Sequence, residues 1–153
     1  MTGPSGYLGA HVLDQLLHKG YSVRGTVRSQ KKADQIRRKY PTAGDKLDLC
    51  IVEDIQKEGV FDSLLNGEFL IIDADIDIDG ICHVASPFHF KPKDNERDLL
   101  LPAIKGTTNL LYSALHVPTI KRIVITSTMA TISHIGKGVW PGKVYNVRPS
   151  DRY

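Results

Sequence analysis

The sequence predicts an α/β domain built around a mainly parallel sheet. Apolar runs typical of buried strands alternate with amphipathic stretches typical of helices, and this alternation is the mark of successive strand–helix–strand units. The length of 153 residues corresponds to one domain, which we expect over residues 1–153. A content of 41% hydrophobic and 24% charged residues is typical of a globular chain and excludes disorder and fibrous folds.

The first half of the chain contains two predicted helices and two predicted strands. Residues 8–18 carry apolar side chains on one helical face, and Gly20 follows the end of this helix. Residues 21–27 are rich in β-formers and predict a strand. A polar helix with a thin apolar stripe is predicted over 30–39, and a buried strand over 47–52.

The second half continues the alternation. A short helix is predicted over 61–65 and an apolar strand over 81–85. A long helical stretch runs from 95 to 115, and Pro102 within it predicts a kink or a break. A last strand is predicted over 120–126. Parallel strands joined by helices are therefore expected along most of the chain.

A glycine-rich segment stands directly before the first helix. Residues 2–9 read Thr-Gly-Pro-Ser-Gly-Tyr-Leu-Gly. Gly3 permits a tight turn, Gly6 lets the backbone approach a pyrophosphate, and Gly9 lets the helix pack closely against a strand. The helix N-terminus adds unpaired N–H groups and a positive dipole end. A turn that binds nothing is the alternative, but the strand–helix context that follows favours a dinucleotide site.

The strand that normally precedes such a motif is missing, since only Met1 stands before Thr2. In a doubly wound sheet that strand is central, and its absence leaves neighbouring strands unpaired. We therefore expect an N-terminally truncated sheet.

Several sequence blocks resemble a known family. They are TGPSGYLG, VRGTVRS (23–29), EDI (53–55), HVASPF (83–88), ERDLLLPAIKGTTNLL (96–111) and RIVITST (122–128). In this order they resemble the extended short-chain dehydrogenases/reductases of the NAD-dependent epimerase/dehydratase superfamily. Within it they are most similar to the dihydroflavonol reductase-like enzymes, and there to fungal NADPH-dependent ketone, aldehyde and methylglyoxal reductases. The resemblance implies a Rossmann-type doubly wound parallel sheet, of which this chain is the cofactor half.

The resemblance also assigns roles to individual residues. It implies that the glycine-rich turn holds the pyrophosphate and that basic residues after the second strand hold the adenosine 2′-phosphate of NADP(H). It further implies that Asp54 and Ile55 lie beside the adenine and that residues 84–86 line the path of the ribose and nicotinamide. The cofactor residues so implied are Gly3, Gly6, Tyr7, Leu8, Gly9, Arg28, Lys32, Asp54, Ile55, Val84, Ala85 and Ser86. Thr128 stands where the family has its catalytic Ser.

The residues themselves favour NADP(H) over NAD(H). An NAD site usually has an acid about 20 residues after the first glycine, to bond the ribose diol. This chain has no acid between Asp14 and Asp34. Arg28 instead stands at the end of the strand predicted over 21–27, which corresponds to the second strand of a complete sheet. A planar guanidinium suits a phosphate group. The alternative is a solvated surface arginine.

The family's catalytic Tyr-x-x-x-Lys pair is absent, because no Tyr of the chain is followed by Lys four residues later. We therefore expect a catalytically incomplete NADP-dependent oxidoreductase whose parent reduces a small carbonyl substrate. Two alternatives remain open: a non-catalytic NADP-binding sensor, and a truncated gene product with no independent function.

Other function classes find little support. The net charge of +3 is too small for nucleic-acid binding, and no apolar run reaches the roughly 20 residues of a membrane helix. Cys50 and Cys82 are expected as buried thiols of a cytoplasmic protein, and His83 as a packed core residue. No metal site is predicted, although aspartates alternate within residues 67–79, a possible insertion relative to the family.

Overall fold

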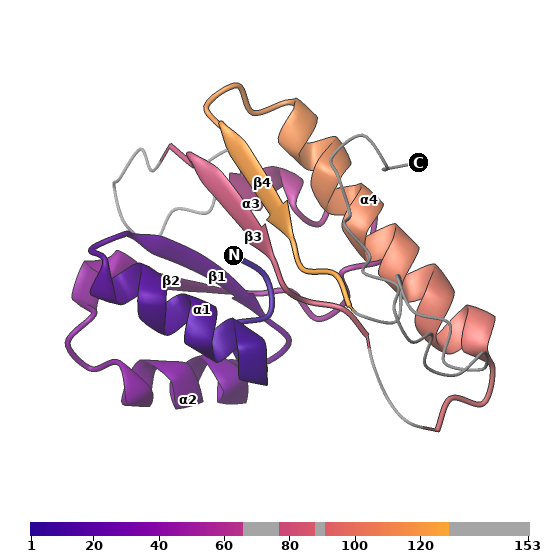
Figure 1. Ribbon diagram of the computed structural model, residues 1–153, viewed down its shortest axis with the longest axis horizontal. Helices are drawn as coiled ribbons and strands as arrows, with labels where there is room; N and C mark the ends of the chain where they lie inside the picture. Colours follow the sequence, from indigo (N-terminus) through magenta and orange to yellow (C-terminus); the bar gives the residue numbers. More distant parts are fainter. Residues whose placement is uncertain (66–76, 88–90, 129–153) are drawn as a thin grey trace, which may run out of the picture.

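A computed structural model describes residues 1–65, 77–87 and 91–128, which form parallel strands flanked by helices (Figure 1). The elements in chain order are α1 (Tyr7–His18), β1 (Val23–Val27), α2 (Gln30–Lys39), a 3₁₀ turn (Gly44–Lys46), β2 (Leu47–Ile51), α3 (Asp62–Leu65), β3 (Gly80–His83), a π-helical turn (Glu96–Leu100), α4 (Leu101–Leu115) and β4 (Arg122–Ile125). None of the helices in these ranges has the length and apolar character needed to cross a membrane.

The strands pair in the order of a doubly wound sheet. β1 runs parallel to β2, and β3 runs parallel to β4. Thr2 joins the two pairs, because it forms parallel bridges with both Thr26 and His83. The backbone N–H of Thr26 donates to Met1 at 3.0 Å, and that of Thr2 donates to Cys82 at 2.9 Å. The spatial order is therefore β2, β1, Thr2, β3, β4.

This arrangement refines the prediction of a missing first strand. Met1 and Thr2 occupy the central position of the sheet, at the level of the C-terminal halves of β1 and β3. The N-terminus accordingly lies between these two strands (Figure 1). Two residues suffice to connect the strand pairs, because each of them bonds a different neighbour.

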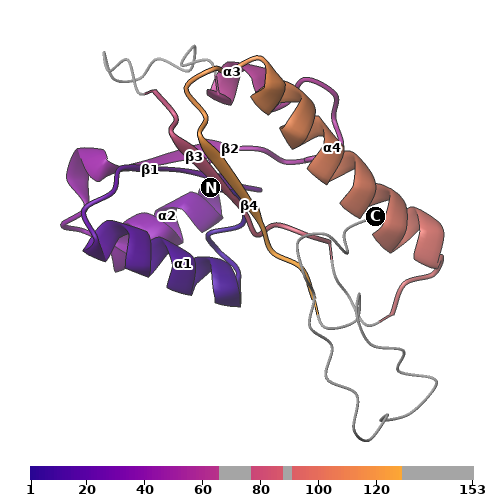
Figure 2. The ribbon, with the colours of Figure 1, turned by 45° about the horizontal axis from the view of Figure 1, so that its top comes forward.

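The sheet separates two apolar layers (Figure 2). On one face α1 and α2 pack against β1 and β2, around Leu13, Val23, Val27, Ala33, Ile36, Leu47 and Leu49. On the other face α3 and α4 enclose a second cluster, made of Cys50, Val52, Phe61, Leu64, Leu65, Ile81, Leu110, Ala114 and Val117. Burying both faces is what a parallel sheet requires. The predicted α/β fold class with a parallel, Rossmann-type sheet is confirmed.

Element boundaries follow the predictions closely, with one informative difference. The predicted break at Pro102 is a change of helix type, since the π-helical turn ends at Leu100 and α4 begins at Leu101. Pro102 sits buried in the first turn of α4, directly after the π-helical turn.

Two further predictions concern burial and an insertion. Cys50 is buried as expected, but Cys82 is only half-buried. Its partner in the sheet register is Val124, which is 52% exposed, so this part of the sheet face is thinly covered. The predicted insertion over 67–79 lies outside the described residues except for its last three positions. Of these, Asp79 pairs with Lys121 at 2.8 Å.

Candidate functional site

The candidate site residues follow the C-terminal ends of the strands. Because all four strands and Thr2 run parallel, these ends meet at one edge of the sheet. Arg28 follows β1, Asp54 lies in the loop after β2, and Val84 follows β3. The glycine-rich turn leaves the same edge after Thr2 and leads into α1. Ligands of open α/β sheets bind in this position, outside the carboxyl ends of the strands.

The glycine-rich turn is held by contacts that leave no room for side chains at two of its positions. Gly3 has φ +71°, and a Cβ added to it would lie 3.0 Å from the backbone N and Cα of Ala85. A Cβ on Gly9 would lie 1.9 Å from the carbonyl oxygen of Gly3. Gly9 therefore lets α1 pack closely against the backbone of Gly3 and Pro4, directly after the sheet position of Thr2, and its close packing against a strand stays a prediction. This contact arises because the chain folds back on itself between Gly3 and α1.

Gly6 is different, because nothing in the described protein requires a glycine there. Its φ is −82°, and an added Cβ would meet only the oxygen of Gly3, at an ordinary 3.5 Å. Gly6 is the N-cap of α1, and the N–H groups of Tyr7 and Leu8 have no acceptor within the helix. The first turn of α1 has no acidic residue, and Tyr7 is 87% exposed. An anionic group such as a pyrophosphate fits this open helix end.

Thr2 ties the turn to the end of β3. Its side chain is buried, and its Oγ1 accepts the backbone N–H groups of Val84 and Ala85, both at 3.1 Å. The segment that contains Val84, Ala85 and Ser86 therefore lies directly beside Gly3. The structure thus brings together the predicted pyrophosphate turn and the predicted ribose and nicotinamide segment.

Arg28 and Lys32 are exposed at the end of β1 and in the first turn of α2. Within the described residues neither forms an ion pair, so their charges are not neutralised by a neighbour. The nearby acid Asp34 already accepts a hydrogen bond from Gln30 at 2.7 Å and faces Arg37 at 3.8 Å. The two free cations can bind a phosphate group.

The loop after β2 presents Asp54 and Ile55. The carboxylate of Asp54 accepts the backbone N–H of Gln56 at 2.8 Å, which shapes the loop locally. Ile55 packs against Gly106 of α4 so closely that a Cβ there would lie 2.4 Å from its Cδ1. The position of this pair thus depends on α4.

Asn109 of α4 holds the same loop through its side-chain amide. Its Nδ2 donates to the carbonyl oxygens of Ile55 at 3.0 Å and of Lys57 at 3.2 Å. Sequence reasoning missed Asn109 and Gly106, because a helical residue gives no sign of the distant loop that it contacts. The spacing of three residues places both on one helical face and is the only available signal.

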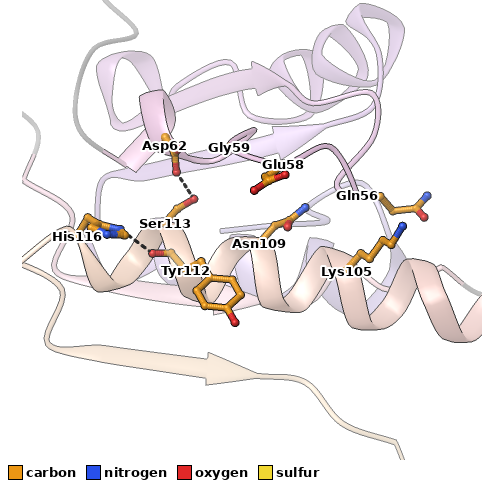
Figure 3. Close-up of a pocket in the computed structure, with 9 residues that line it drawn as sticks. All are labelled: Gln56, Glu58, Gly59, Asp62, Lys105, Asn109, Tyr112, Ser113 and His116. Carbon is orange, nitrogen blue, oxygen red and sulfur yellow. Dashed lines mark hydrogen bonds between the residues drawn. The ribbon is translucent and has the colours of Figure 1, made fainter.

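A groove of about 650 Å³ lies between α4 and this loop (Figure 3). It is lined by Gln56, Glu58, Gly59, Asp62, Lys105, Asn109, Tyr112, Ser113 and His116. Among these lining residues, Ser113 donates a hydrogen bond to the Asp62 carboxylate at 2.5 Å. None of the predicted site residues lines this groove. We therefore place the candidate site at the sheet edge, where the glycine-rich turn and the basic residues lie.

Thr128, the predicted catalytic hydroxyl, lies exposed three residues beyond the end of β4. The backbone N–H of Thr126 donates to the carbonyl oxygen of His83 at 2.9 Å, which carries the sheet pairing one residue past the end of β4. Thr128 therefore leaves the same sheet edge as the other predicted site residues.

Comparisons with known proteins agree with this arrangement. The sequence pattern of the NAD dependent epimerase/dehydratase family matches residues 1–146. An uncharacterized oxidoreductase of Schizosaccharomyces pombe is 44% identical over 95% of this chain and 40% of its own length. The ketoreductase azaE of Aspergillus niger is 42% identical over 86% of this chain and 38% of its own length.

The fold has a similar solved counterpart. The structure of yeast methylglyoxal/isovaleraldehyde reductase Gre2 complexed with NADPH matches with a TM-score of 0.77 and 33% identity. The match covers 88% of this chain and 38% of the yeast protein. The present chain thus spans about two fifths of the length of the proteins that it matches.

Proposed function

Since the chain belongs to the NAD dependent epimerase/dehydratase family, we propose that it is the cofactor-binding part of an NADP(H)-dependent carbonyl reductase. The observation that carries the proposal is the turn before α1. There Gly6 is the N-cap of α1, and neither its backbone conformation nor any neighbouring atom of the described protein requires a glycine. The glycine is explained if a pyrophosphate approaches the backbone at this position.

Each part of the sheet edge has a separate task in this proposal. The N–H groups of Tyr7 and Leu8 bond the pyrophosphate oxygens, and the rigid contact of Gly3 with Gly9 keeps them in place. The guanidinium of Arg28, with Lys32 beside it, holds the 2′-phosphate. NADPH supplies a hydride from C4 of its nicotinamide to an aldehyde or ketone.

The remaining residues act on the adenine and on the reacting end. Asp54 and Ile55 border the adenine, and Val84, Ala85 and Ser86 line the path of the ribose and nicotinamide. Thr128 donates a hydrogen bond to the substrate carbonyl oxygen, since a threonine hydroxyl can donate as well as accept. The relatives named as a ketoreductase and as a methylglyoxal/isovaleraldehyde reductase support a small carbonyl compound as the substrate.

We further propose that these 153 residues bind the cofactor without turning over a carbonyl at a useful rate. No Tyr has a Lys four residues after it, and the loss of a positioned proton donor costs about 10²–10⁴-fold in rate. The purified chain should show no NADPH oxidation above background with methylglyoxal, simple aldehydes or ketones. Turnover at ordinary enzyme rates would contradict this part of the proposal.

The cofactor proposal is tested by titrating the chain with NADPH and NADH. NADPH should bind more tightly, and Arg28→Ala should weaken only NADPH binding, by about 1.5–3 kcal/mol, the range for a hydrogen bond to a charged group. Arg38→Ala is the matched control, because it removes the same charge from the far end of α2. Equal affinity for both cofactors in the unchanged protein would refute the proposal.

A further inference from the structure

A buried histidine links three parts of the fold through its ring nitrogens. His83, the last residue of β3, is 3% exposed, and Thr2 beside it is 2% exposed. Nδ1 of His83 lies 2.9 Å from Oγ1 of Thr2, and its Nε2 lies 3.3 Å from Oγ1 of Thr107 in α4. The expectation of a packed core histidine is thus met, with both nitrogens hydrogen-bonded.

The hydrogen-bond partners of Thr2 determine where the protons lie. A threonine hydroxyl offers one proton and two lone pairs. The backbone N–H groups of Val84 and Ala85 can only donate, so they take both lone pairs of Oγ1. The hydroxyl proton is then directed to His83, whose Nδ1 must carry no proton in order to accept it. The ring proton is consequently on Nε2 and points to Thr107.

We propose that His83 is a positioning residue for the candidate site, acting as a neutral imidazole that accepts the hydroxyl proton of Thr2. This contact orients Thr2 so that its lone pairs face Val84 and Ala85. Ala85 in turn lies against Gly3, where the glycine-rich turn begins. The inference rests on the proposed NADP(H) site for its functional consequence, but the proton arrangement stands on the hydrogen bonds alone.

A proton added to Nδ1 would break this arrangement. The hydroxyl of Thr2 would then face three donors with two lone pairs, and one of the N–H groups of Val84 and Ala85 would lose its acceptor. Acid should therefore loosen the end of β3 from the glycine-rich turn. The affinity for the oxidised cofactor NADP⁺ should fall as His83 takes up this proton.

The surroundings of His83 keep it neutral at physiological pH. Burial lowers the pKa of its imidazole, and the charge of the Met1 amino group lowers that pKa further. From α4 it faces the uncharged Thr107, and in the sheet its register partner is Ile125. Because the folded pKa lies below the ordinary value of 6.5, its contribution to stability is complete above that pH. This contribution is lost as the pH falls from there toward the folded pKa.

Two substitutions distinguish a role of His83 as hydrogen-bond acceptor for Thr2 from a role in core packing alone. His83→Asn places an amide oxygen near the position of Nδ1 and keeps an acceptor for Thr2, without titrating. His83→Gln places its amide group near Nε2 and leaves Thr2 without that acceptor. We expect His83→Asn to bind NADP⁺ within a few fold of the unchanged chain, and His83→Gln to bind about tenfold more weakly, as for one lost hydrogen bond. Equal losses, or no loss in either variant, would overturn the proposal.

Matched changes at Thr2 complete the comparison. Thr2→Ser keeps the hydroxyl and should behave like the unchanged chain, whereas Thr2→Val should resemble His83→Gln. Between about pH 8 and pH 5 the affinity of the unchanged chain should decrease more steeply than that of His83→Asn. Since the asparagine variant retains the Met1 amino group, an acid effect shared by both chains does not come from His83. Parallel pH profiles would refute the role of His83.

A spectroscopic measurement tests the proton arrangement of His83 independently of the proposed NADP(H) site. The ¹⁵N chemical shifts of the His83 ring in the unchanged chain report directly which nitrogen carries the proton, with no cofactor present. A protonated Nε2 and a bare Nδ1 at neutral pH are expected, and a protonated Nδ1 would overturn the inference even if NADP⁺ binds. A chain with the expected tautomer that binds no NADP⁺ would instead refute the proposed function.

Discussion

Replacing Gly9 by alanine tests the packing on which the candidate site depends. An added Cβ would lie 1.9 Å from the oxygen of Gly3, where ordinary contact begins at 3.4 Å, so the two groups must separate by about 1.5 Å. That oxygen also accepts the N–H of Gly6 at 3.1 Å, which closes the turn. The displacement should therefore open the turn as well as push α1 outward.

The expected cost follows from opposing contributions. Alanine favours a helix by about 1 kcal/mol over glycine. Overpacking against rigid backbone costs about 1–3 kcal/mol, and the weakened turn hydrogen bond adds about 0.5–1.5 kcal/mol. Gly9→Ala should thus lower the free energy of unfolding by about 1–3 kcal/mol in urea titrations followed by circular dichroism. NADPH binding should fall by more than tenfold, because the displaced N–H groups no longer converge on the pyrophosphate.

Gly106→Ala is the matched control, as another glycine replaced within a helix. Its added Cβ would lie 2.4 Å from Cδ1 and 2.8 Å from Cγ1 of Ile55, so the strain falls on a side chain that can change its rotamer rather than on backbone. We expect a destabilisation of less than about 1 kcal/mol, because the helix-propensity gain offsets part of the strain. If Gly9→Ala leaves both stability and NADPH affinity unchanged, the packing argument is wrong.

Two further predictions concern α4 and the buried thiol. Asn109→Ala removes the hydrogen bonds to Ile55 and Lys57 and should cost about 1–3 kcal/mol of stability. An unchanged urea midpoint would show that this loop is held by packing alone. Burial, with the nearby Asp48 carboxylate, raises the pKa of the Cys50 thiol to about 11. Iodoacetamide should therefore alkylate Cys50 in the folded chain roughly a hundredfold more slowly than a free cysteine, and urea should abolish the protection. Rapid labelling of Cys50 without urea would contradict this.

Local patterns in the sequence were sufficient to predict most of the secondary structure. The apolar stripe formed by Ala33 and Ile36 predicts a helix over 30–39, and α2 has these bounds in the structure. The prediction succeeds because helical periodicity depends only on residues close together in the chain. Apolar runs identify the strands equally well, although β3 ends at His83, two residues before the predicted end. The glycine-rich turn was also evident, since its spacing and the following helix are both local.

The tertiary structure decided the contacts between distant segments. The sequence shows Gly9 as part of a motif, but its packing against Gly3 depends on the path of the turn. Likewise the hold of Asn109 on the loop after β2 joins residues more than fifty positions apart.

The same division applies to the centre of the sheet. By itself the sequence determined an α/β fold, a dinucleotide-type turn and a basic residue at the end of β1, because these depend on periodicity and short spacing. That Thr2 stands in the place of a central strand, and that its hydroxyl connects the turn to His83, was decided only in three dimensions. The physical reason is that hydrogen bonds between strands far apart in sequence leave no periodic trace in either segment.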